Sequence, residues 1–282
     1  MESNIEVDPI LIGQPFRTPI RAVVVGCGGT GARLIQPLTQ VLRRGDSLAL
    51  VDGDHVEDRN LMRQNFRQRD VGLNKAEVLA RRYRKDGVEV QSYSAMLTEE
   101  NFRAIMTPPD RERNTGVVIF GCVDSAAGRR VIQSGYPNIQ CLWIDGGNEM
   151  RGGQVLLSAR GWPFQVKAMK PHSSGSGEMV MGQHTGQWAI QGMKAMPQLL
   201  KTRPEEAEEQ SCRERIDLQT VAVNQLSASC MLNIFTNVLN GVPMSNCGAF
   251  FSTLNTMTPI KVGEVKWPSM EVIPEQTYVL KD

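Results

Sequence analysis

The chain has 282 residues, and its 31 Lys and Arg nearly balance its 30 Asp and Glu, which leaves a formal net charge of +1 at pH 7. This balance provides no general attraction to nucleic acid or to a membrane surface. The length suits one large domain or two small ones, the amino-terminal sequence MESNIEVDPI lacks a signal-peptide pattern, and no apolar run approaches the ~20 residues that cross a bilayer.

Short apolar runs alternate with helical patterns through the first half of the chain. Strands are expected at residues 21–26, 47–52, 88–93, 116–122 and 141–147. Helices are expected at residues 30–44, 74–86, 98–106 and 125–135. Apolar strands that are buried on both faces and separated by helices indicate an α/β fold with a Rossmann-like, doubly wound, mainly parallel sheet.

The rhythm changes after residue 150. Residues 152–160 and 248–267 have the pattern of antiparallel strands, and a long helix is expected at 220–240. We therefore expect one domain over residues 1–282, with a nucleotide-binding core at 20–150 and an antiparallel extension at 151–282.

Residues 167–188 are rich in Gly, Ser and Met and show too little periodicity for a packed element. We expect them to belong to a mobile loop of about residues 165–212. Two interpretations of this loop stay open: a connector without regular structure, or a segment that covers a substrate.

A glycine-rich turn separates the first expected strand from the first expected helix. The sequence GCGGTG, residues 26–31, contains Gly26, Gly28, Gly29 and Gly31. Glycines allow a tight turn and the close approach of a phosphate to the amino terminus of the helix. The turn predicts a nucleotide without saying which one, and a purely structural glycine turn is the alternative.

The stretch LVDGDHVEDRNLMRQNF follows the second expected strand, whose end carries Asp52. A carboxylate in that position can accept hydrogen bonds from ribose hydroxyls, as in NAD enzymes. Arg63 lies just beyond it, and Lys75 begins another helix. Two cations that converge on the glycine turn exceed what a dinucleotide pyrophosphate needs and suit a triphosphate.

Asp124 ends the fourth expected strand, in the sequence FGCVDSAAG. A carboxylate there offers a hard oxygen ligand for Mg²⁺. A ribose acid, phosphate cations and a metal carboxylate would therefore stand on strand ends, where open α/β sheets bind their ligands.

Four motifs, GCGGTG, DGDHVEDRNLMRQ, DVGLNKAE and GCVDS, occur in the order and spacing of a known family. The chain resembles the ThiF/MoeB/HesA adenylyltransferases, relatives of the ubiquitin-activating enzymes, over residues 20 to about 160. The resemblance implies an enzyme that uses ATP and Mg²⁺ to adenylate the carboxyl-terminal glycine of a small ubiquitin-like or sulfur-carrier protein. The sequence leaves open which of these two the substrate is.

The resemblance also implies roles for individual residues. Asp52 would hold the ribose and Asp124 would carry Mg²⁺, and Arg63, Lys75 and Asp124 would serve catalysis. The residues expected to contact the nucleotide are Gly26, Gly28, Gly29, Gly31, Asp52, Asp54, Asn60, Arg63, Gln64, Lys75 and Asp124.

The chain departs from the family pattern in three ways. Ser125 stands where the family usually has Asn, and the second half has no C-x-x-C zinc pairs. The family often supplies an arginine from a helix before the first strand, whereas prolines interrupt this part of the chain. Arg17 or Arg21 could replace that arginine. These departures resemble the divergent bacterial members encoded in operons with ubiquitin-like proteins, where a conjugating-enzyme-like protein would be a further partner.

Cys212 is a second chemical candidate. It lies in EEAEEQSCRERIDLQ, after a polar stretch and before an expected helical one, with Arg213 and Arg215 beside it, and arginines and helix amino termini favour the thiolate. In the ubiquitin-activating branch a cysteine after the mobile loop accepts the acyl group as a thioester; an incidental exposed thiol is the alternative. Cys27, Cys122, Cys141 and Cys230 fit the core better. The six cysteines form no C-x-x-C pair, which favours reduced thiols and a cytoplasmic protein.

Two other classes of function stay open. A nicotinamide-dependent oxidoreductase would account for the glycines and Asp52 but would leave Arg63, Lys75 and Asp124 unused. A catalytically inactive scaffold could bind a ubiquitin-like partner through the same surface. Because the family generally pairs its α/β cores and the chain has 14 methionines, which form adaptable apolar surface, we also expect a homodimer or a heteromeric complex.

Overall fold

The computed structural model describes residues 10–13, 19–108, 115–148, 152–170, 180–190, 192–201, 221–244, 246–252, 261–265 and 271–272. Arg17 and Cys212 are among the positions outside these ranges.

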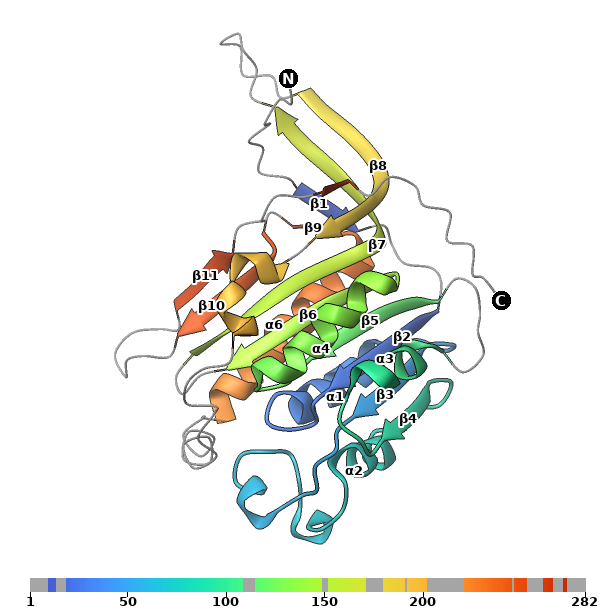
Figure 1. Ribbon diagram of the computed structural model, residues 1–282, viewed down its shortest axis with the longest axis vertical. Coiled ribbons are helices and arrows are strands. Elements are labelled where there is room, and N and C mark those ends of the chain that lie inside the picture. Colours follow the sequence, from blue (N-terminus) through green and yellow to red (C-terminus); the bar gives the residue numbers. More distant parts are fainter. Residues whose placement is uncertain are drawn as a thin grey trace.

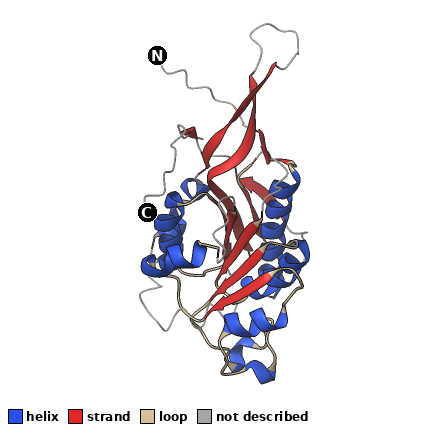
Figure 2. Cartoon of the chain, turned by 90° about the vertical axis from the view of Figure 1, so that its right-hand side faces the viewer, coloured by secondary structure: helices blue, strands red, loops and turns tan. Residues whose placement is uncertain are grey.

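One mixed sheet forms the centre of the molecule, with helices on both of its faces (Figures 1 and 2). Its main path runs β11-β10-β7-β6-β5-β2-β3-β4. The parallel strands are β2 (Ile20–Val25), β3 (Ser47–Val51), β4 (Glu89–Tyr93), β5 (Gly116–Gly121) and β6 (Cys141–Asn148). The antiparallel strands of the path are β7 (Gly152–Lys170), β10 (Gly248–Ser252) and β11 (Lys261–Val265). The expected fold class is confirmed, and all five parallel strands lie within one residue of their expected bounds.

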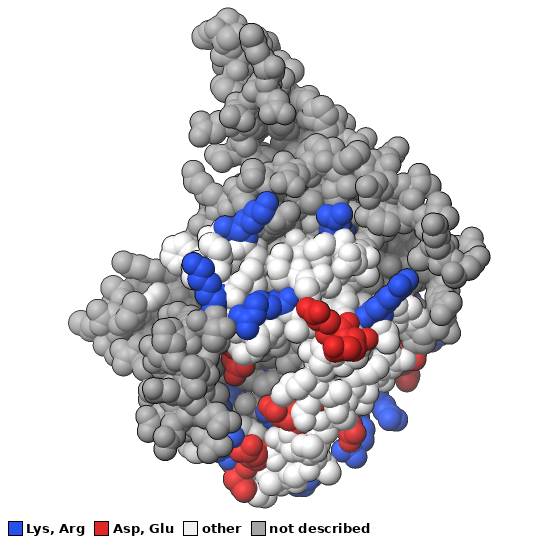
Figure 3. Space-filling model, viewed as in Figure 1, with Lys and Arg blue, Asp and Glu red and all other residues white. Residues whose placement is uncertain are grey.

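The described helices are α1 (Gly31–Val41), α2 (Lys75–Arg82), α3 (Glu99–Met106), α4 (Ala126–Gly135) and α6 (Val221–Asn240). Short 3₁₀ turns are η1 (Asp58–Asn60), η2 (Gln68–Asp70), η3 (Tyr136–Asn138), η4 (Gly192–Ala195) and η5 (Pro197–Leu200). The remaining strands are β1 (Ile10–Gly13), β8 (Val180–Ile190), β9 (Pro243–Met244) and β12 (Glu271–Val272). No described helix is long and apolar enough to cross a membrane. The face seen in Figure 3 carries both basic and acidic side chains.

Alternate residues of each parallel strand face opposite layers, which builds two hydrophobic cores. On one face Val24, Phe120 and Ile144 pack with residues of α1, α2 and α6, and Phe120 meets Phe235 edge-on with ring centroids 5.3 Å apart. On the other face Val23, Ile119 and Trp143 pack with residues of α3 and α4. The central strands β2, β3 and β5 are therefore covered on both sides and are buried along their whole length.

The strand order reverses beside β2. The chain moves outward from β2 to β3 and β4 and then returns to add β5 on the opposite side of β2. The loops that follow β2 and β5 therefore diverge and leave a crevice at the carboxyl ends of these strands, the usual ligand position in such sheets.

The expectation that residues 167–188 lack regular structure is wrong for the part that the structure describes. β7 continues to Lys170 and pairs antiparallel with β8, from Met169 opposite Met181 to Trp162 opposite Trp188, as the long ribbon beyond the sheet in Figure 1 shows. Ladder hydrogen bonds can stabilise a ribbon of low periodicity, and glycines such as Gly182 and Gly186 obscure the alternation that predicts strands. Residues 171–179 lie outside the described part, and mobility of the segment stays a prediction.

Candidate functional site

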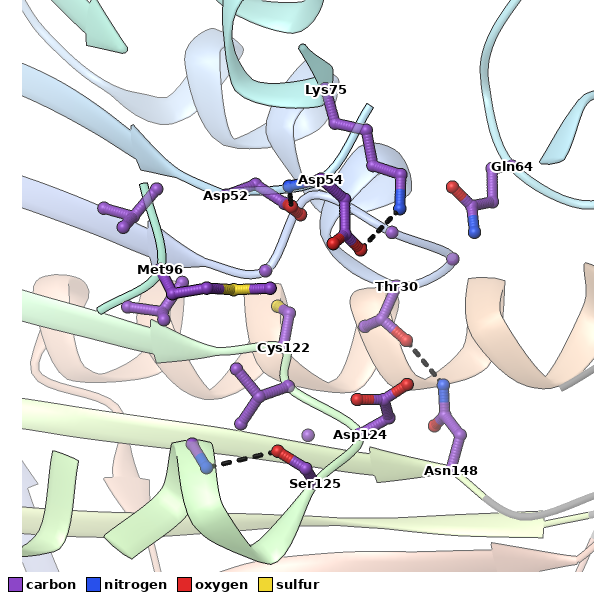
Figure 4. Close-up of a pocket in the computed structure, with 18 of the residues that line it drawn as sticks. Thr30, Asp52, Asp54, Gln64, Lys75, Met96, Cys122, Asp124, Ser125 and Asn148 are labelled. Atoms are coloured by element: carbon purple, nitrogen blue, oxygen red, sulfur yellow. Dashed lines mark hydrogen bonds and ion pairs between the residues drawn. The ribbon is translucent and has the colours of Figure 1, made fainter. Parts of the chain in front are cut away.

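A pocket of about 510 Å³ opens at the carboxyl ends of β2, β3 and β5 (Figure 4). It is lined by all the residues expected to contact a nucleotide except Gly31, namely Gly26, Gly28, Gly29, Asp52, Asp54, Asn60, Arg63, Gln64, Lys75 and Asp124. These residues come from positions up to 98 apart in the sequence, from Gly26 to Asp124, and the crevice beside β2 brings them together.

The glycine turn joins β2 to α1 where the backbone approaches β5 closely. Gly26 has a φ of +90°, and a Cβ there would lie 2.6 Å from the carbonyl oxygen of Cys122. A Cβ on Gly31 would lie 1.9 Å from the carbonyl oxygen of Gly26. Gly28 differs, because its Cβ would meet nothing nearer than Gln64 Nε2 at 3.8 Å. Gly26 and Gly31 therefore shape the turn, whereas Gly28 leaves room above it.

Gly31→Ala should lower the free energy of unfolding by about 2 kcal/mol, because the new methyl group forces the turn apart. Gly28→Ala is the matched control and should leave stability nearly unchanged. Urea denaturation of the three proteins measures the difference. Equal midpoints for the two variants would show that the close approach of Gly31 to Gly26 does not constrain the fold.

Asp52 connects the glycine turn to the end of β3. It is 7% exposed, one carboxylate oxygen accepts from Cys27 N at 2.6 Å, and the other accepts from Asp54 N at 2.8 Å. Burial raises the pKa of the Asp52 carboxyl, and the two backbone donors and nearby Lys75 oppose that rise. An acid held in this way has a fixed position and keeps lone pairs for a ligand in the pocket.

Lys75 points into the pocket and pairs with Asp54, with Nζ and Oδ2 2.9 Å apart (Figure 4). Lys75 is the first residue of α2, and Asn74 caps that helix by accepting from Glu77 N. The Asn74 amide also donates to Asp52 O at 2.8 Å and Asp54 O at 3.1 Å. One helix cap therefore fixes Lys75 relative to the end of β3, where Asp54 is the carboxylate partner of the lysine.

Asn60 ends the short turn η1, Arg63 and Gln64 follow it, and all three residues line the pocket. Asn60 Oδ1 accepts from Glu57 N at 2.9 Å, so this buried amide also holds the turn in shape. Gln64 is buried and faces the glycine turn, and the carbonyl oxygen of Arg63 accepts from Arg33 Nη2 at 3.1 Å. Residues on and just after η1 therefore line the same pocket as Lys75.

Asp124 lies on the loop after β5 and is exposed to the pocket. The next residue, Ser125, caps α4, because its hydroxyl accepts from Gly128 N at 3.2 Å. The described residues contain no group of three His, Cys, Asp or Glu that could hold a metal by themselves. A single carboxylate is nevertheless the donor set that suits Mg²⁺ when phosphates and waters complete its coordination.

A buried ion pair supports the loop that carries Asp124, and the sequence analysis missed it. Arg129 Nε lies 2.8 Å from Asp145 Oδ2, with side chains 6% and 1% exposed, and Arg129 Nη2 donates to Val123 O at 2.8 Å. Burial raises the pKa of the Asp145 carboxyl, and Arg129 opposes the rise. Arg129 therefore links β6 to the residue that precedes Asp124.

Other pocket residues also escaped the sequence analysis, among them Thr30, Met96, Cys122, Asn148 and Asn224. Asn148 ends β6, so its strand-end position was a usable signal. Asn224 gave no signal, because it lies within a helix whose pattern suggested only packing. Cys122 packs against the core as expected, but it is half-buried and also lines the pocket.

Arg21 does not face this pocket. It is fully buried, Nε donates to Ile105 O at 2.9 Å, and Nη2 donates to Gln91 Oε1 at 3.0 Å. The expectation that Arg21 could replace the family's amino-terminal arginine is therefore wrong. Arg17 and Cys212 lie outside the described residues, so their expected roles stay predictions.

The reversal of strand order, the glycine turn and the strand-end acid define an α/β protein of the Rossmann-like class. The chain belongs to the ThiF family, whose model matches residues 17–276. No curated protein sequence matches the chain closely enough to count as a relative.

Solved structures agree with this fold. The chain is similar to selenomethionine PaaA, with a TM-score of 0.51, 15% identity, and coverage of 89% of this chain and 65% of that one. It is similar to E. coli MccB with ATP, with a TM-score of 0.54, 16% identity, and coverage of 88% and 63%. It is also similar to E. coli MccB with AMPCPP and selenomethionine MccA, with a TM-score of 0.53, 17% identity, and coverage of 88% of this chain and 64% of that one. The chain thus spans somewhat less than two-thirds of the length of these proteins.

Proposed function

We propose that this chain transfers AMP from ATP to the carboxyl-terminal carboxylate of a protein or peptide. The observation that carries the proposal is one pocket in which the glycine turn, Asp52, Lys75 and Asp124 converge. A ribose acid and a phosphate cradle alone would also serve a nicotinamide cofactor. Lys75 and Arg63 add the positive charge that a triphosphate requires.

The reaction needs no protein nucleophile. A carboxylate oxygen attacks the α-phosphorus of ATP, the bond from that phosphorus to the bridging oxygen breaks, and pyrophosphate leaves with the electron pair. Lys75 and Arg63 neutralise the charge on the leaving group, Asp52 holds the ribose, and the glycine turn fixes the phosphates. Asp124 would hold Mg²⁺, which screens the phosphate oxygens when bound.

Family membership supports the use of ATP, and the similar E. coli MccB has been solved with ATP and with MccA-N7isoASN. Within this class we favour a ubiquitin-like protein with a carboxyl-terminal glycine. A sulfur-carrier protein is the alternative substrate. The alternative function is an inactive scaffold that binds the same partner. We also propose that the active species is a homodimer or a heteromeric complex, which sedimentation with and without the partner tests.

ATP–pyrophosphate exchange tests the proposal. The probe is a set of hexapeptides that end in Gly-Gly, and the control is the same set with amidated carboxyl termini. Exchange that requires the free carboxylate is expected. Exchange that ignores amidation would refute attack by the carboxylate, and an absence of exchange together with tight ATP binding would indicate the inactive scaffold.

Nucleotide affinity should fall as the pH drops toward the raised pKa of Asp52. The ionised carboxylate accepts two ribose hydroxyl hydrogen bonds better than the neutral acid does. Because burial raises this pKa above the usual 3.8, affinity is present above the raised pKa and is lost as the pH falls through it. Calorimetric titration of AMP measures the loss. Asp52→Asn should show only the decline caused by protonation of adenine, and parallel curves for both proteins would contradict the role of Asp52.

Cys212→Ala should abolish a thiol-sensitive conjugate and keep pyrophosphate exchange. In the conjugate the Cys212 thiolate attacks the acyl carbon of the adenylate and AMP leaves with the electron pair. Mass spectrometry before and after treatment with excess free thiol, which cleaves a thioester by acyl exchange, detects the adduct, and Cys230→Ala serves as the control. An adduct that persists in Cys212→Ala would assign the role to another cysteine, and no adduct in the wild type would favour an enzyme that stops at the adenylate.

A further inference from the structure

Three uncharged polar side chains meet at one end of the pocket, and none of them belongs to the expected nucleotide set. Thr30 lies in the glycine turn, Asn148 ends β6, and Asn224 lies in the first turn of α6. The Asn148 amide donates to Thr30 Oγ1 and to Asn224 Oδ1, the latter at 2.8 Å, and Thr30 Oγ1 lies 3.4 Å from Asn224 Oδ1. We call these three residues the amide cluster.

The hydroxyl of Thr30 does not cap the helix that Thr30 begins. Thr30 is the N-cap residue of α1, where a threonine hydroxyl usually accepts from a backbone N–H of the first turn. Here it makes no cap hydrogen bond and contacts the two asparagines instead. The Thr30 hydroxyl therefore contributes to the amide cluster instead of to the cap of α1.

Asn224 carries a buried donor without a partner among the described residues. The side chain is 1% exposed, and its Nδ2 makes no hydrogen bond within the described part of the chain. A Cβ on Gly29 would lie 2.5 Å from this Nδ2, so the amide lies directly against the glycine turn at the pocket wall. Buried amide donors are almost always satisfied, which indicates that a ligand supplies the acceptor.

The amide cluster lies on the side of the pocket away from the phosphate cations. Figure 4 shows Thr30, Asn148 and Asp124 on one side, and Lys75 and Gln64 on the other. In an in-line displacement the attacking oxygen and the leaving oxygen stand on opposite sides of the phosphorus. With pyrophosphate near Lys75, the attacking carboxylate arrives from the side of the amide cluster.

The chemistry of the amide cluster fits this nucleophile. Amides and a hydroxyl orient a carboxylate, or the peptide carbonyl before it, through neutral hydrogen bonds instead of an ion pair. A lysine or arginine there would bind the carboxylate and reduce its nucleophilicity. We propose that Thr30, Asn148 and Asn224 bind the terminal peptide unit of the acyl substrate, with Asn224 Nδ2 donating to it. This proposal rests on the proposed function.

Two stable adenylate analogues test the assignment by calorimetry. The first is 5′-O-sulfamoyladenosine, and the second carries a glycylglycyl group on the sulfamate nitrogen. The wild type should bind the acylated compound at least about tenfold more tightly. Asn224→Ala should remove most of this ratio and leave the affinity for the unacylated compound unchanged. Asn148→Ala should act in the same direction, and Asn233→Ala, an exposed position on the same helix, should change neither affinity.

Each other outcome overturns the assignment. An unchanged ratio in Asn224→Ala and Asn148→Ala would show that the amide cluster does not contact the acyl group. Equal weakening for both compounds would show that it serves the nucleotide or the shape of the turn. A ratio of one in the wild type would place the acyl group elsewhere while leaving the nucleotide site intact. Binding of neither compound would instead refute the proposed function.

Discussion

Asp124→Asn should lower the rate of ATP–pyrophosphate exchange at least about 100-fold and leave the stability of the fold unchanged. The reason is that Asp124 is exposed to the pocket at the end of β5, so it adds little to the core, whereas its charge would hold the ion beside the phosphates. Asparagine preserves the shape and removes the charge. The rate is measured with the hexapeptides described above at saturating ATP and Mg²⁺.

Asp86→Asn is the matched control, because Asp86 is exposed beyond α2 and does not line the pocket. It should exchange pyrophosphate at the wild-type rate. Normal exchange in Asp124→Asn would remove Asp124 from the metal site. Reduced exchange in both variants would indicate a general effect of charge instead of a local one.

Arg129→Met should lower the free energy of unfolding by about 3–5 kcal/mol, since it leaves the Asp145 carboxylate buried and without its cation. The variant also removes the hydrogen bond to Val123 O, so the loop before Asp124 loses a support. Urea denaturation at neutral pH gives the loss of stability.

Arg130→Met provides the control, because Arg130 is the exposed neighbour on the same helix and should cost less than about 1 kcal/mol. The double variant Arg129→Met with Asp145→Asn should recover part of the loss, because it no longer buries an uncompensated charge. Equal stability of Arg129→Met and Arg130→Met would mean that the buried pair contributes nothing.

The parallel half of the fold could be predicted because its signals are local. Strands such as β2 and β5 are apolar on both faces, and helices with spaced apolar residues separate them, so the period alone defines the layers. The residues at their ends could be predicted for the same reason: a parallel sheet brings its carboxyl ends to one edge. Asp52 and Asp124 therefore meet in one pocket although 72 positions separate them.

The parts that could not be predicted depend on contacts with no local signature. β8 pairs with β7 through backbone hydrogen bonds, which leave no pattern in a segment rich in glycine and serine. Arg129 was hidden because a buried arginine and a solvated one look alike in a helical sequence, and only its contact with Asp145 distinguishes them. Asn224 reaches the pocket because α6 packs closely on β6, where a Cβ on Gly146 would lie 2.6 Å from Met231 Sδ.

The proposed reaction breaks the bond between the α- and β-phosphates of ATP when a terminal carboxylate attacks the α-phosphorus. The most direct measurement follows ATP labelled at the α-phosphate during incubation with protein, Mg²⁺ and the hexapeptides that end in Gly-Gly, with separation of the labelled products. Label is expected in AMP and in an acyl-adenylate that hydroxylamine cleaves, with none in ADP. Label in ADP would mean that the γ-phosphate is transferred instead, and would contradict attack at the α-phosphorus.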